Sequence, residues 1–144
     1  MRSVMAAVLL LVGCGGNPVG TSAGWWLRLQ EARDRWDAAA IRDYAYTYQR
    51  SCFCPFTRLQ VTVAGGAVVA VYDLEADTAF VAPYPDLTMG GLFAEIAEAL
   101  TDHPAEFSAE YDPATGVPRS ASFDPIANAV DDEWGFSVTG FSGP

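Results

Sequence analysis

Polar and apolar side chains alternate along two long stretches of this chain, and each stretch follows a segment with helical periodicity. Alternation places successive side chains on opposite faces of a strand, whereas spacings of three and four place them on one face of a helix. The patterns come in the order helix, three strands, helix, three strands. We therefore predict an α+β domain whose antiparallel sheet consists of two three-stranded meanders, with two helices packed on one face.

The first half of this pattern begins with a predicted helix over residues 25–41, in which apolar residues recur at spacings of three and four. Three predicted strands follow over residues 43–54, 57–63 and 68–74. In the first strand, a period of two places Tyr44, Tyr46, Tyr48, Arg50, Cys52 and Cys54 on one face. We regard Tyr44, Tyr46, Tyr48 and Arg50 as a candidate ligand-binding face.

The second half begins with a predicted helix over residues 89–101, for which Thr88 is the expected N-cap. Its apolar stripe contains Met89, Phe93, Ile96 and Leu100. Alternation then predicts three strands over residues 107–111, 117–123 and 134–138. A turn with the sequence Asp-Pro-Ala-Thr-Gly joins the first two of them.

The amino-terminal residues have the features of an export signal: Arg2, a short apolar run and then small residues. The apolar run is shorter than the roughly 20 residues that span a bilayer. Leu11-Val12-Gly13-Cys14 resembles the lipobox of bacterial lipoproteins, in which the signal is removed before a cysteine that then carries lipid. We therefore expect a lipoprotein signal peptide over residues 1–13 and lipidation of Cys14, with a flexible tether over residues 14–24. A single domain would occupy residues 25–144.

These features predict an exported chain that is anchored by lipid to a bacterial membrane, the outer membrane if the cell is Gram-negative. The chain has a formal charge of −10 and no lysine, so a phosphate backbone would repel it and nucleic acid is excluded as a partner. We expect the membrane to hold the chain through its lipid only. The remaining expected partner is an unknown envelope protein or a small ligand.

Several spaced motifs run along the chain beyond the tether. They are Trp36, Ile41, Asp43, Tyr44 and Tyr46; Cys52-Phe53-Cys54-Pro55; Tyr111-Asp112-Pro113 with Gly116 and Pro118; and Asp124 with Asp131-Asp132-Glu133. On these motifs the chain resembles a family of exported bacterial proteins known as domain of unknown function 6174. The resemblance implies a secreted or lipid-anchored α+β domain and implies no catalytic residue.

Cys52 and Cys54 remain as a pair once Cys14 is assigned to lipid, and a disulfide between them is the main interpretation outside the cytoplasm. Reduced thiols, a thiol-redox pair and half of a metal site are the alternatives. In an extended strand the two Cα atoms would lie about 6.6 Å apart, near the upper limit for a disulfide. Closing so small a loop would stabilise the fold by only about 1.6 kcal/mol.

Other chemistry-bearing residues are weaker candidates. Asp124, Asp131, Asp132 and Glu133 supply oxygen ligands of the kind that Ca²⁺ prefers, although turn capping explains aspartates of this kind equally well. Residues 20–24 match the Gly-x-Ser-x-Gly pattern of hydrolases but follow a tether, and the chain has one histidine, His103. We therefore expect a non-enzymatic binding module, with a thiol-redox accessory protein or a calcium-dependent binding module as alternatives.

Overall fold

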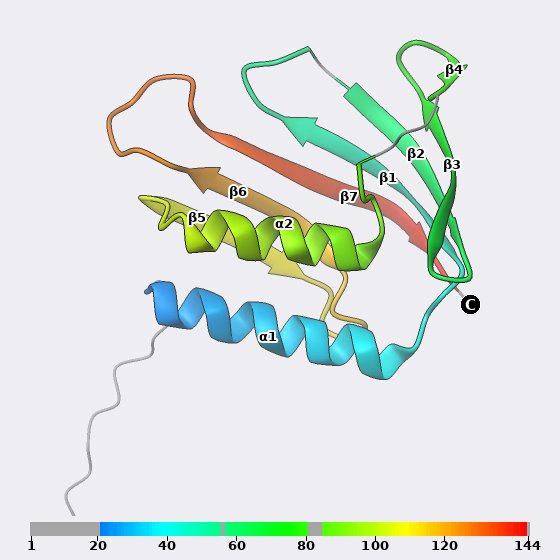
Figure 1. Cartoon of the computed structure of the whole chain (residues 1–144), viewed down its shortest axis with the longest axis horizontal. Helices are drawn as coiled ribbons and strands as arrows, with labels where there is room; N and C mark the ends of the chain where they lie inside the picture. Colours follow the sequence, from blue (N-terminus) through cyan, green and yellow to red (C-terminus); the bar gives the residue numbers. More distant parts are fainter. Residues whose placement is uncertain (1–20, 56, 81–84, 144) are drawn as a thin grey trace, which may run out of the picture.

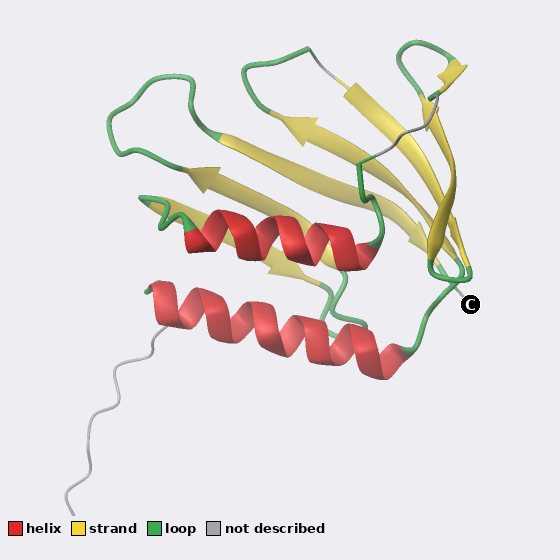
Figure 2. Cartoon of the chain, in the orientation of Figure 1, coloured by secondary structure: helices red, strands yellow, loops and turns green. Residues whose placement is uncertain are grey.

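The computed structural model describes residues 21–55, 57–80 and 85–143. It contains two helices and seven strands, whose arrangement is shown in Figure 2. The helices are α1 (Ser22–Ala39) and α2 (Met89–Thr101). The strands are β1 (Tyr44–Ser51), β2 (Thr57–Ala64), β3 (Ala67–Asp73), β4 (Thr78–Ala79), β5 (Glu106–Tyr111), β6 (Pro118–Asp124) and β7 (Trp134–Ser142). This content confirms the predicted α+β class.

The strands form one antiparallel sheet in the order β4-β3-β2-β1-β7-β6-β5 (Figure 1). The prediction of two three-stranded meanders is therefore wrong, because the last strand, β7, pairs with the first, β1, and joins the two halves into one sheet. Tyr48 faces Val138 in this pairing. The contact joins residues about 90 positions apart, and alternation within each strand carries no information about it. The two-residue strand β4 is too short to produce a periodic pattern.

Both helices lie on the same side of the sheet, with α2 between α1 and the strands β6 and β7 (Figure 1). The core lies between the helices and the inward face of the sheet, and it contains Leu29 and Ala32 of α1 together with the predicted stripe of α2. The tyrosines of β1 and alternate residues of β2 complete it. The sequence periodicity therefore identified the buried faces of both helices.

Helix α1 begins three residues before the predicted position. Thr21 is its N-cap, and the Thr21 hydroxyl accepts a hydrogen bond from the backbone N–H of Gly24 at 3.2 Å. Ser22, the serine of the Gly-x-Ser-x-Gly pattern, is the first residue of this helix. Among the described residues, neither helix is long and apolar enough to cross a membrane.

Candidate functional site

A hollow of about 500 Å³ opens between one side of α2 and the adjoining ends of β1 and β2. The helices cover the β5–β6–β7 half of the sheet more fully than they cover β2 (Figure 1). The hollow lies beside α2 on the less covered side. Most of its wall is apolar and comes from Pro55, Leu59, Pro85, Leu87 and Ala94. The hollow therefore has the size and lining of a small-molecule site.

The ion pair between Arg50 and Glu95 forms part of the wall of this hollow. The Arg50 guanidinium donates to the Glu95 carboxylate at 2.6 Å and lies 3.4 Å from the Tyr48 hydroxyl. The same guanidinium lies over the Trp134 ring, 4.7 Å from its centroid. Glu95 neutralises the charge of Arg50, so this pair offers hydrogen bonds rather than a net charge. The acids Asp86 and Glu98 lie at the same hollow.

The other two tyrosines of the predicted ligand-binding face are core residues. Tyr46 donates from its hydroxyl to the carbonyl of Leu87, and the Tyr44 hydroxyl accepts from the backbone N–H of Met89 at 2.9 Å. These bonds attach β1 to the first residue of α2 and to the segment that precedes the helix. Burial raises the pKa of both phenols, so they are neutral at physiological pH. Of the four predicted residues, Tyr48 and Arg50 line the hollow.

Cys52 and Cys54 lie in the turn after β1, which ends at Ser51. Their placement on the face of an extended strand is therefore wrong. The backbone N–H of Cys54 donates to the carbonyl of Cys52 at 2.8 Å, and this tight turn brings the Cα atoms to 5.1 Å. The two sulfur atoms are in close contact, at a Cα separation that suits a disulfide. Cys14 lies outside the described residues.

We expect neither Cys52 nor Cys54 to react with an alkylating reagent until the chain has been treated with a reductant, because the close contact favours an oxidised pair. Mass spectrometry after alkylation with iodoacetamide measures this directly. The variant Cys14→Ser is the control, since it removes the third cysteine from the count. Alkylation of both residues without reductant would show that the pair is reduced.

Three of the four predicted calcium ligands line two small hollows at the end of the sheet. Asp131 and Glu133 line one, and Asp124 and Glu133 line the other. Asp132 accepts a hydrogen bond from the backbone N–H of Ile126 at 3.0 Å, which closes the loop between β6 and β7. Within the described part of the chain, no group of three or more His, Cys, Asp or Glu side chains is arranged to hold a metal ion.

The fold and the hollow together define a small α+β domain with one open antiparallel sheet and a largely apolar hollow beside its second helix. Residues 28–143 match the family of unknown function DUF6174, and the chain belongs to this family. No curated protein and no solved structure matches the chain.

Sequence reasoning missed most of the residues that line the hollow. Leu59 lies within a predicted strand without any sign of a site, and Ala94, Glu95 and Glu98 lie outside the apolar stripe of the second helix. The one available signal was Arg50, a charged side chain on the same strand face as three tyrosines. A cation in that position requires a partner, and Glu95 supplies it.

Proposed function

We propose that this chain is a lipid-anchored domain of the bacterial cell envelope that binds a small, largely apolar molecule in the hollow beside α2. The observation that carries the binding role is the hollow itself, whose volume of about 500 Å³ lies in the usual range for ligand sites. The lipobox supports the anchor, and an unmodified Cys14 in the mass spectrum of the purified chain would contradict it.

The lining indicates how such a molecule would be held. Leu59 and Leu87 supply apolar contact, while the Arg50–Glu95 pair supplies both a donor and an acceptor at one wall. A few polar groups in an apolar cavity orient a ligand, and apolar burial provides most of its affinity. A molecule with an apolar body and one polar end would therefore satisfy the hollow.

The neutral dye N-phenyl-1-naphthylamine is a suitable probe, since its fluorescence increases in apolar surroundings. We expect saturable binding to the unaltered chain, and a loss of affinity of about tenfold or more in Ala94→Phe, because the new ring occupies the hollow (tenfold is about 1.4 kcal/mol). Ala38→Phe is the matched control, since Ala38 is an exposed alanine of α1 outside this hollow. Equal affinity for both variants would exclude the hollow as the binding site.

A further inference from the structure

Two neighbouring loops hold large apolar side chains out in solvent. Phe53, in the turn between β1 and β2, is 84% exposed. Val130 and Ile126, in the loop between β6 and β7, are 83% and 63% exposed. The two loops project from the same end of the sheet (Figure 1), since Ser51 at the end of β1 pairs with Gly135 at the start of β7. Exposed apolar side chains gathered in this way are characteristic of interaction sites.

Hydrogen bonds within each loop fix the positions of these side chains. In the first loop, Cys54 donates from its backbone to Cys52. In the second loop, Ala129 donates from its backbone to the Ile126 carbonyl at 3.0 Å, and the Asp132 carboxylate accepts from the Ile126 N–H. The exposed tips are therefore parts of defined turns, so binding through them would cost little conformational entropy.

A groove of about 270 Å³ separates the two loops, and side chains from both of them line it. Phe53 and Trp134 supply its aromatic surface, and Asp131 and Glu133 supply its charge. Residues 124–133 contain four acids and no basic residue. The surface thus combines apolar tips with a strongly acidic groove.

The exposed apolar side chains alone would suit a membrane, a second copy of the chain or another protein. The negative charge of the groove distinguishes between these partners. A bilayer with anionic lipids would repel the four acids, and so would a second copy of a chain whose formal charge is −10. A protein surface with lysine or arginine around an apolar pocket would pair with them. An arginine or lysine side chain suits the groove in particular, because its aliphatic stem can pack on the exposed Phe53 ring while its charged end meets carboxylates.

We propose that the two loops form a docking surface for a second protein, in which Phe53 and Val130 enter an apolar pocket and basic residues at the rim of that pocket meet Asp131 and Glu133. This surface adjoins the hollow beside α2, because Cys54 and Pro55 of the same loop line that hollow, but the two share no lining residue and the surface does not depend on a ligand in the hollow.

The test uses the full chain in its native cells, with the photoreactive residue p-benzoylphenylalanine at position 53. We expect one discrete cross-linked protein whose cross-linked segment is rich in lysine or arginine. In the background of Asp131→Asn with Glu133→Gln, the yield should fall about tenfold or more, because the charge complementarity is lost. Glu31→Gln with Asp34→Asn is the matched control, since it removes the same charge from exposed positions of α1 and should leave the yield unchanged.

The same photoreactive residue at position 72 tests the specificity of the surface, because Tyr72 is an exposed aromatic residue of β3 in a different part of the sheet. It should not capture the same protein. The proposal is overturned if position 53 gives no discrete product, or cross-links to lipid or to a second copy of the chain. It is equally overturned if the captured segment is not basic, or if both pairs of charge variants give the same yield.

Discussion

The substitution Gly116→Ala is expected to destabilise the fold by about 3 kcal/mol or more, well above the usual effect of a single change. Gly116 lies in the turn between β5 and β6 with φ of +79°, a conformation that costs other residues about 1–2 kcal/mol. A β-carbon at this position would lie 2.0 Å from the carbonyl oxygen of Ala32 and 3.0 Å from the backbone nitrogen of Trp36. The turn therefore packs directly on the backbone of α1, and the added methyl group would separate the two.

The control for this effect is Gly65→Ala. Gly65 has φ of +60° in the turn between β2 and β3, and a β-carbon there would have nothing within 4 Å. The Gly65→Ala variant should therefore lose only the stability that corresponds to the cost of a positive φ, about 1 kcal/mol. Urea unfolding followed by tryptophan fluorescence measures both variants. Similar losses for Gly116→Ala and Gly65→Ala would mean that the turn is not in close contact with α1.

Short-range pattern was sufficient to predict the elements of this fold but not their assembly. Periodicity predicted both helices and six of the seven strands, because helix and strand spacing is a local property of the sequence. It missed the pairing of β1 with β7, which depends on the shape of the whole sheet. It also extended the first strand through Cys52 and Cys54, where the alternation continues although the backbone turns.

The candidate site was harder to predict from the sequence than the fold was. The hollow results from the incomplete cover that two helices provide for a seven-stranded sheet, and no local pattern describes a space that side chains leave open. Arg50 and Glu95 are 45 residues apart, so their pairing was not predictable. The tyrosines of β1 were predicted to share one face. Tyr44 and Tyr46, however, use their hydroxyl groups for hydrogen bonds to the backbone of Met89 and Leu87, at the start of α2 and just before it.

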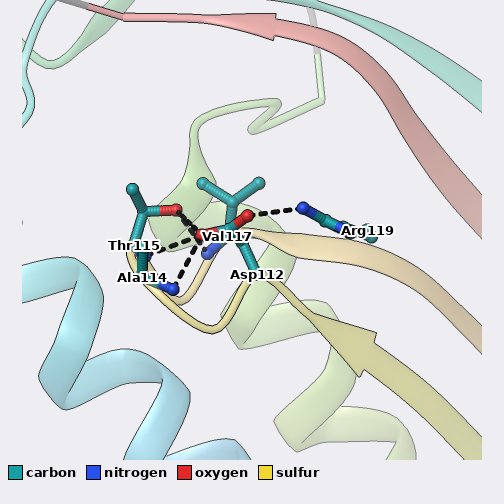
Figure 3. Close-up of polar contacts among 5 residues, drawn as sticks. All are labelled: Asp112, Ala114, Thr115, Val117 and Arg119. Carbon is teal, nitrogen blue, oxygen red and sulfur yellow. Dashed lines mark hydrogen bonds and ion pairs between the residues drawn. The ribbon is translucent and has the colours of Figure 1, made fainter.

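The second large loss of stability is expected when Asp112 is replaced, because its carboxylate organises the turn that contains Gly116 (Figure 3). One carboxylate oxygen accepts from the backbone N–H groups of Ala114 and Thr115, at 2.9 and 2.8 Å, and from the Thr115 hydroxyl at 3.0 Å. The other oxygen accepts from Arg119 at 2.6 Å. Asp112→Ala removes all of these charge-assisted bonds and should cost about 2 kcal/mol.

The bonds to Asp112 also make stability depend on pH. The backbone N–H of Thr115, followed by the Thr115 hydroxyl and Arg119, lowers the pKa of Asp112 to about 2. A carboxyl group whose pKa is lower in the folded chain stabilises the fold above its ordinary pKa of 3.8, and this contribution is lost as the pH falls toward 2. Because solvent screens this turn, the pH-dependent part should be about 1 kcal/mol.

Urea unfolding of the unaltered chain and of Asp112→Asn, at several pH values between 2 and 6, measures this contribution. The difference in unfolding free energy should be largest near pH 6 and shrink below pH 4, because asparagine retains an acceptor for the backbone N–H groups but has no charge for Arg119. Asp73→Asn is the matched control, since Asp73 accepts from two backbone N–H groups of its own turn, at 2.9 and 3.0 Å, without an arginine. A difference for Asp112→Asn that stayed constant from pH 6 to pH 2 would show that the Asp112 charge contributes nothing, and that the turn depends only on hydrogen-bond geometry.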